Sequence, residues 1–217
     1  MQALNSYIDH TLLRPDATTA EIQVLCNEAL TNNFAAVCVL PSHVRDVVKF
    51  LKGSSVKVCS VVGFPLGANT LETKCFEASQ LASFGAQELD MVINIGALKS
   101  GNYQFIKDEI IAVVRSAAPA IVKVIIETCL LTKEEKITVC QLACEAGAHF
   151  VKTSTGFSKS GATVEDISLM SHAVAGYSVG VKASGGIKDR TTALAMINAG
   201  ATRIGTSSGV SIISRES

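Results

Sequence analysis

The sequence predicts an α/β fold, a single TIM (β/α)8 barrel that forms one domain over residues 1–217. Two observations predict it. Short apolar runs rich in valine and isoleucine alternate with amphipathic segments along the whole chain, which is the pattern of parallel strands joined by helices. The length of 217 residues and the 48% hydrophobic content also suit one domain with a large core.

Eight apolar runs are the predicted strands. An open, doubly wound sheet commonly has only about five or six strands, and no G-x-G-x-x-G motif follows the first run, so we favour a closed barrel over a dinucleotide-binding sheet. The predicted strands are residues 7–10, 35–40, 57–62, 88–94, 122–127, 150–153, 179–183 and 203–205.

Seven amphipathic segments separate these runs, and a short one follows Thr206. Two of them begin with a capping box, in which a hydroxyl and a carboxylate each bond a free N–H of the first turn. A recurring Gly-Ala pair predicts a left-handed glycine at three helix ends, and this recurrence indicates repeated strand-helix units. The capping boxes are Thr18-x-x-Glu21 and Thr132-x-x-Glu135, and the glycines are Gly85, Gly147 and Gly200.

Composition and charge argue against several classes of protein. Lys+Arg and Asp+Glu both number 19, so the chain lacks the basic excess of a nucleic-acid-binding protein. We find no signal peptide and no apolar run near the roughly 18 residues of a membrane span, and we expect a cytoplasmic protein without a membrane partner. The seven cysteines form no C-x-x-C pair and are expected to be buried, reduced thiols. The four histidines are scattered, so we expect no metal site.

Charged residues in otherwise apolar strands are the candidates for catalysis, because a barrel carries its active site at the carboxyl ends of its strands. Lys152 ends one predicted strand, Lys182 ends the next, and Asp90 lies within an earlier one. Neighbouring strands lie about 4.8 Å apart, so both amines can contact one small substrate. Two adjacent cations also favour the release of a proton from one of them. Lys152 is therefore the predicted nucleophile, and Lys182 the residue that tunes it.

Asp90 is expected to face the same lumen as the two lysines and to pass protons through water. Simpler interpretations remain open for all three residues. A lysine at a strand end can point to solvent, and Asp90 can be a structural carboxylate paired with Lys123 or Lys182.

Two glycine- and serine-rich segments after the last two predicted strands indicate a phosphate site. Loops after strands 7 and 8, next to a short final helix, are where this fold binds phosphate, and glycine lets backbone N–H groups approach the oxygens. The predicted phosphate ligands are Gly185, Gly186, Gly205, Ser207 and Ser208.

These motifs together resemble the deoxyribose-phosphate aldolase family of class I, Schiff-base aldolases. The matching phrases run in order from residue 8 to residue 208, and the most specific is Lys-Thr-Ser-Thr-Gly at residues 152–156. Others are Ile8-Asp9-His10-Thr11-Leu12-Leu13, Val62-Gly63-Phe64-Pro65-Leu66-Gly67 and Val181-Lys182-Ala183-Ser184-Gly185-Gly186.

The resemblance implies reversible cleavage of 2-deoxy-D-ribose 5-phosphate to D-glyceraldehyde 3-phosphate and acetaldehyde, without a metal or an organic cofactor. It implies a Schiff base on Lys152, proton transfer by Asp90 and Lys182, a phosphorylated sugar as substrate and a homodimer. One position departs from some relatives, which carry a lysine where this chain has Phe157. Lys159 is a possible substitute for it.

Two other classes of function remain open at this point. A phosphate-binding barrel isomerase or another Schiff-base enzyme, such as a transaldolase, would share the anion site and differ in the sugar that reacts. A sugar-phosphate binding protein on the same scaffold would need neither the paired lysines nor Asp90, and the fold alone does not exclude it.

Overall fold

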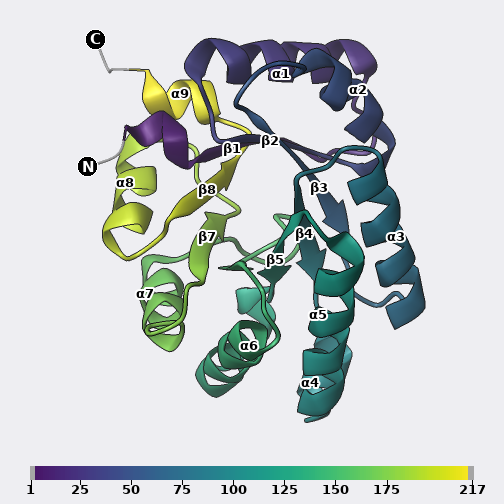
Figure 1. Ribbon diagram of the computed structural model, residues 1–217. Helices are drawn as coiled ribbons and strands as arrows, with labels where there is room; N and C mark the ends of the chain where they lie inside the picture. Colours follow the sequence, from purple (N-terminus) through teal and green to yellow (C-terminus); the bar gives the residue numbers. More distant parts are fainter. Residues whose placement is uncertain (1–2, 215–217) are drawn as a thin grey trace.

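The computed structural model describes residues 3–214, which form a closed barrel of parallel strands (Figure 1). Each strand is hydrogen-bonded to the next, and the last pairs with the first. The predicted (β/α)8 barrel is thus confirmed, while the expected domain ends at residues 1 and 217 lie outside the described part of the chain. The strands are β1 (Ile8–Leu12), β2 (Ala36–Val39), β3 (Lys57–Val62), β4 (Glu88–Val92), β5 (Ile121–Ile125), β6 (Phe150–Lys152), β7 (Gly180–Ser184) and β8 (Arg203–Thr206).

Helices surround the barrel on its outside (Figure 1). Two of them, α4 and α5, fill the connection between β4 and β5, and short 3-10 turns precede β1 and follow β2 and β5. The α-helices are α1 (Thr19–Asn32), α2 (Val44–Phe50), α3 (Leu71–Ser83), α4 (Ile95–Lys99), α5 (Tyr103–Ala117), α6 (Lys133–Glu145), α7 (Val164–Ala173), α8 (Arg190–Asn198) and α9 (Gly209–Ile213), and the 3-10 turns are η1 (Leu4–Tyr7), η2 (Pro41–His43) and η3 (Thr128–Leu130).

Several predicted strand ends were wrong by one or two residues. The first strand begins after Tyr7, which ends η1, and it continues to Leu12 because Leu12 still pairs with Val39 of β2. The fourth ends at Val92 rather than at residue 94, because the Asn94 side chain accepts the N–H of Ala97 and starts α4. The fifth ends before Glu127, which has a left-handed backbone with φ 56°.

The predicted helix signals are confirmed. In both capping boxes the threonine hydroxyl accepts the N–H of the glutamate three residues on, and the glutamate accepts the threonine N–H. The three glycines have φ of 103°, 82° and 115°, a left-handed conformation that side chains resist, so each can end a helix and turn the chain toward the next strand.

Alternation along the strands separates an apolar layer from a charged interior. In β4, Leu89 and Met91 belong to the main hydrophobic core, whereas Asp90 between them points to the opposite side, into the barrel. In β5, Val122 and Val124 alternate with Lys123 in the same way. The barrel therefore buries charged side chains at its centre, where each must find a partner.

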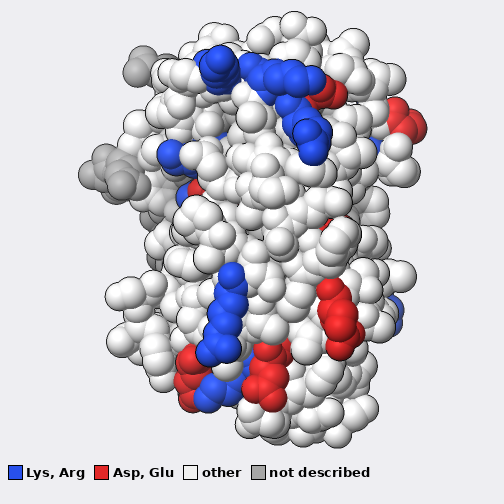
Figure 2. Space-filling view, turned by 45° about the vertical axis from the view of Figure 1, so that its right-hand side comes forward, with Lys and Arg blue, Asp and Glu red and all other residues white. Residues whose placement is uncertain are grey.

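The outer surface carries charges of both signs. On the face shown in Figure 2, basic and acidic side chains lie next to one another toward the top and the bottom of the view, with a broad uncharged area between. No helix among residues 3–214 is both long and apolar enough to span a bilayer. All seven cysteines are free thiols; five are buried as expected, but Cys75 and Cys129 are only half-buried.

Candidate active site

Lys152, Lys182 and Asp90, the three predicted catalytic residues, meet inside the barrel. Lys152 of β6 and Lys182 of β7 are register partners, and each amine donates to the same carboxylate oxygen, Oδ2 of Asp90, at 2.7 Å. Lys152 is 3% exposed, and the other two side chains are fully buried. The structure therefore excludes the simpler interpretation that these lysines point to solvent.

Asp90 is also paired with Lys123, as the alternative interpretation suggested. The Lys123 amine lies 2.8 Å from Asp90 Oδ1 and 2.7 Å from a Glu88 oxygen. Burial alone would raise the pKa of Asp90, but the positive charges of Lys123, Lys152 and Lys182 outweigh it and hold that pKa well below its usual value. Asp90 is thus both a structural partner of Lys123 and a neighbour of the two candidate catalytic amines.

A second layer of charges lies beneath Lys182. Its amine also contacts Asp9 of β1, and Arg203 of β8 donates to Asp9 at 2.6 Å and to Glu88 at 3.0 Å. Burial favours the neutral amine of Lys182, yet Asp9 and Asp90 outweigh that effect and raise its pKa. Sequence reasoning gave no role to Asp9, Glu88 or Arg203, although Asp9 stood in one of the quoted motifs.

Two groups of side chains here have the spacing of metal ligands, Cys38-Cys59-Asp90 and Asp9-Cys59-Glu88, with ligand atoms within 4.8 Å of one another. A lysine amine already lies among these atoms. The Lys123 Nζ is 3.3 Å from the Cys59 sulfur and 3.6 Å from Asp9, in addition to its contacts with Glu88 and Asp90. Because an ammonium ion meets these donors, the residues present do not fit a metal ion, and the absence of a metal from the mechanism remains a prediction.

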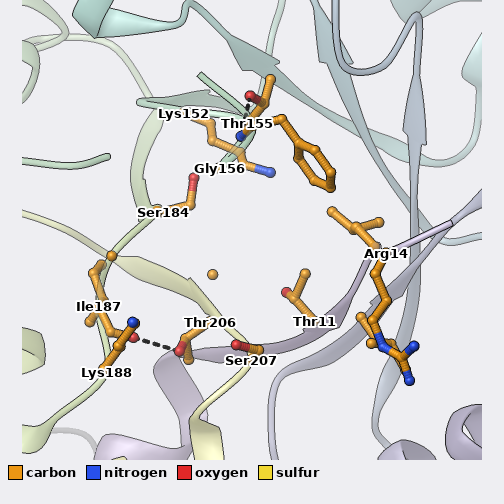
Figure 3. Close-up of a pocket in the computed structure, with 16 residues that line it drawn as sticks. Thr11, Arg14, Lys152, Thr155, Gly156, Ser184, Ile187, Lys188, Thr206 and Ser207 are labelled. Atoms are coloured by element: carbon orange, nitrogen blue, oxygen red, sulfur yellow. Dashed lines mark hydrogen bonds between the residues drawn. The ribbon is translucent and has the colours of Figure 1, made fainter. Parts of the chain in front are cut away.

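A pocket of about 320 Å³ opens above this cluster at the carboxyl ends of the strands. Its volume suits a small phosphorylated sugar. Lys152 lines it, whereas Lys123, Lys182 and Asp90 are not among the described lining residues. Figure 3 shows the Lys152 amine on one side of the cavity, with Thr206 and Ser207 across from it. An amine and a hydroxyl-rich loop thus face each other over the space for a ligand.

Four of the five predicted phosphate ligands line this pocket, namely Gly185, Gly186, Gly205 and Ser207. Gly185 and Gly186 have φ of 88° and 80°, a conformation that favours glycine and bends the chain sharply after β7. Ser208 is not among the lining residues; its N–H donates to Thr206 Oγ1 at 2.9 Å, and it precedes α9. The structure thus brings Gly185, Gly186, Gly205 and Ser207 together and places Ser208 just behind them.

The cationic residues at the rim differ from the expected one. Phe157 lines the pocket, but Lys159 is not among the lining residues; Arg14 and Lys188 are. Arg14 bonds Asp16 at 2.8 Å and also contacts Glu21, and Figure 3 shows its guanidinium turned away from the centre of the cavity. Sequence reasoning missed both residues, although Lys188 comes two residues after the Gly185-Gly186 pair.

The loop after β6 and the loop after β7 are in direct backbone contact. The N–H of Ala162 donates to the carbonyl oxygens of Ser184 and Gly185 at 3.1 Å each. A Cβ atom added to Gly161 would lie 2.1 Å from the Gly185 carbonyl oxygen, so only glycine fits there. The segment that follows the candidate nucleophile is therefore fastened to the candidate phosphate loop.

Comparisons with known proteins point in the same direction. Residues 4–215 match the model of the DeoC/LacD family of aldolases. A curated deoxyribose-phosphate aldolase of Brevibacillus brevis is 59% identical over 97% of this chain and 95% of its own length. The solved structure of the aldolase QR15 superposes with a TM-score of 0.93 at 44% identity, over 98% of this chain and 95% of that one. A tetrameric deoxyribose phosphate aldolase of Aeropyrum pernix has a TM-score of 0.91 at 35% identity, over 97% and 89% of the two chains.

Proposed function

Because this chain belongs to the DeoC/LacD family of aldolases, we propose that it cleaves 2-deoxy-D-ribose 5-phosphate reversibly to D-glyceraldehyde 3-phosphate and acetaldehyde, through a Schiff base on Lys152. The observation that carries the proposal is the position of the Lys152 amine. Three lysines surround Asp90 in the described part of the chain, and Lys152 is the one of them that lines the pocket. The amine therefore meets a bound aldehyde while it keeps its contact with the buried cluster.

The charge of the cluster supports Lys152 as the amine that reacts in its neutral form. With every group ionised, four cations oppose three carboxylates and one positive charge remains in excess. Burial is outweighed by neighbouring carboxylates at Lys182 and Lys123, whose pKa values are raised, so both amines are protonated before substrate binds. Lys152 is the amine of this cluster that lines the pocket, so it is the one that must be neutral when it adds to an aldehyde. The cations are Lys123, Lys152, Lys182 and Arg203, and the carboxylates are Asp9, Glu88 and Asp90.

The reaction follows from the chemistry of an imine. The Lys152 amine adds to the C1 aldehyde carbon, and loss of one water gives a protonated imine. Removal of the proton from the C3 hydroxyl breaks the C2–C3 bond, whose electrons form an enamine on the two-carbon fragment, and glyceraldehyde 3-phosphate leaves. The enamine takes up a proton at C2, and one water then hydrolyses the imine to acetaldehyde and the free amine.

We assign the proton transfers to Asp90 and Lys182. Asp90 accepts hydrogen bonds from both amines, so a proton can pass between Lys152 and Lys182 across one oxygen atom. Lys182, held protonated by Asp9 and Asp90, is suited to donate a proton to the carbinolamine oxygen that leaves as water. When water adds to the protonated imine, it loses a proton, which Asp90 passes to the neutral Lys182 amine, so that Lys182 regains the proton it had donated.

Binding of the substrate phosphate is assigned to the loops after β7 and β8. Gly185, Gly186, Gly205 and Ser207 line the same pocket as Lys152, and Ser208 supports the turn behind them. We propose that the aldolase domain spans the whole chain, that the protein acts as a homodimer, and that it works in the cytoplasm. Its free thiols support a reducing compartment.

Borohydride trapping tests the function directly. Acetaldehyde plus borohydride should reduce the imine and leave an ethyl group on Lys152, located by mass spectrometry of peptides, and Lys152→Met should abolish the label. Cleavage of the 2-deoxy pentose phosphate, with acetaldehyde as a product, should exceed that of other sugar phosphates. A label on another lysine, or none, rules out the proposal. Activity on another phosphorylated sugar would favour an isomerase or transaldolase, and binding without turnover a non-catalytic protein.

A further inference from the structure

Glu127 forms a bulge directly beside the candidate nucleophile. The N–H of Ile126 donates to the carbonyl of Lys152 at 3.0 Å, and the N–H of Thr128 donates to the carbonyl of Thr153 at 2.9 Å. In a regular parallel pair the second bond would reach Ser154, two residues after the first. One extra residue is therefore present on the β5 side. It is Glu127, whose φ of 56° and ψ of 66° are uncommon for a residue with a side chain.

The Glu127 carboxylate is hydrogen-bonded to the loop that follows Lys152. It is 2% exposed and accepts the N–H of Thr155 at 3.3 Å and the Thr155 hydroxyl at 2.5 Å. The Thr155 oxygen in turn accepts the N–H of Phe157 at 3.1 Å, drawn as a dashed line in Figure 3. A line of hydrogen bonds thus runs from the bulge through Thr155 to the backbone of Phe157, and Thr155 and Phe157 both line the pocket.

The same bulge leaves the carbonyl of Ser154 free to bond β7, on the other side of the loop that follows Lys152. Because Thr128 bonds Thr153, the Ser154 carbonyl is left for the Ser184 hydroxyl of β7, which donates to it at 2.6 Å. The Ser184 N–H also donates to the Thr153 hydroxyl at 3.1 Å. The segment that follows Lys152 is therefore held on one side by Glu127, just after β5, and on the other by Ser184 of β7.

We propose that Glu127 is a positioning residue, which sets where Thr155 and Phe157 stand relative to the Lys152 amine and so determines how well the substrate is bound. This inference rests on the proposed aldolase function. A carboxylate suits the role because both groups that it meets are donors; it has only acceptors, whereas an amide would turn an N–H toward one of them. The uncommon backbone conformation of Glu127 can persist because surrounding contacts stabilise it, and here the hydrogen bonds from Thr155 do so.

The test separates positioning from general support of the fold. Glu127→Gln and Thr155→Val should each raise the KM for 2-deoxy-D-ribose 5-phosphate about tenfold or more, while kcat falls much less. Thr155→Ser keeps the hydroxyl and should restore the wild-type KM. The double variant should be little worse than Thr155→Val alone, because both changes disturb the hydrogen bond between the Thr155 hydroxyl and the Glu127 carboxylate.

A matched control is Glu135→Gln. Glu135 also accepts a threonine N–H, from Thr132 at 2.7 Å, but in the capping box of α6 rather than at the pocket, so its KM should not change. Borohydride trapping of acetaldehyde on Lys152 monitors the proposed function independently, and it should persist in the Glu127 and Thr155 variants. If trapping works but the KM stays at the wild-type value in both variants, or if only the folded fraction falls, Glu127 has no positioning role. If the wild type itself is not trapped, the proposed function fails instead.

Should Glu127→Gln fail to fold, Thr155→Val decides alone, because valine has nearly the shape of threonine and lacks only the hydroxyl. An unchanged KM in that variant would overturn the inference, and a raised KM that serine reverses would support it.

Discussion

Lys152 and Lys182 are register partners on adjacent strands, and their amines donate to the same oxygen of Asp90 at 2.7 Å. One of the two lines the pocket and the other does not. Lys152 is therefore placed to meet a ligand in the pocket, whereas Lys182 holds a positive charge beneath it. The consequences for rate, for stability and for substrate preference can be measured separately.

Replacing Lys182 tests the lower amine. Lys182→Leu removes the cation that donates protons and that neutralises Asp9 and Asp90, so kcat should fall about 100-fold or more while the KM changes little. Steady-state kinetics across pH, on protein shown to be folded by circular dichroism, measure this. Lys133→Leu on the outer surface is the control. An unchanged rate and pH profile would show that Lys182 takes no part in the reaction.

Asp90 should make the stability of the protein depend on acid pH. Its folded pKa lies well below the ordinary value of an aspartate in an unfolded chain, so the ionised carboxylate stabilises the fold above that ordinary value, and this contribution is lost as pH falls through the folded pKa. Asp90→Asn removes it. In urea titrations, the difference in unfolding free energy between wild type and variant should be large near about pH 6 and shrink below about pH 4. Asp108→Asn, on an exposed side chain, should show no such trend, and a difference that stays constant with pH would contradict the assignment.

Phe157 lines the pocket and is 54% exposed, and its ring lies edge-on to that of Phe64, with the ring centroids 5.3 Å apart. Phe157→Lys adds a cation at the pocket, so the KM for the phosphorylated substrate should fall about three- to tenfold at low salt, with a smaller gain at high salt. The KM for unphosphorylated 2-deoxyribose should not fall. Phe157→Leu separates loss of the ring from gain of charge. Equal effects of lysine and leucine would show that charge at this position does not reach the phosphate.

The sequence allowed the three central residues to be found because one rule covers them. A charged side chain in an apolar strand points away from the helices, and parallel strands place such side chains in one lumen. Asp9 and Arg203 obey the same rule, but their strands are short and already polar, so neither stood out. Lys123 was considered only as a partner of Asp90; its contacts with Glu88 and Cys59 depend on pairings between distant segments.

The bulge at Glu127 shows where prediction from local pattern stopped. The run at residues 122–127 looks like an unbroken strand, because nothing in a valine- and isoleucine-rich segment indicates a left-handed glutamate. Its conformation depends on Thr155, which lies 28 residues further along the chain. Arg14 and Lys188 were missed for a related reason, since the sequence does not tell which loop residues border the mouth of the barrel.

The contact between Gly161 and Gly185 has a consequence for how the protein selects its ligand. Because the loop after β6 and the loop after β7 are joined through their backbones, we expect a fixed distance between the Lys152 amine and the proposed phosphate ligands. On the proposed function, this fixed distance selects substrates by the number of carbon atoms between the aldehyde and the phosphate. A shorter or longer sugar would reach either the Lys152 amine with its aldehyde or the loops after β7 and β8 with its phosphate, but not both.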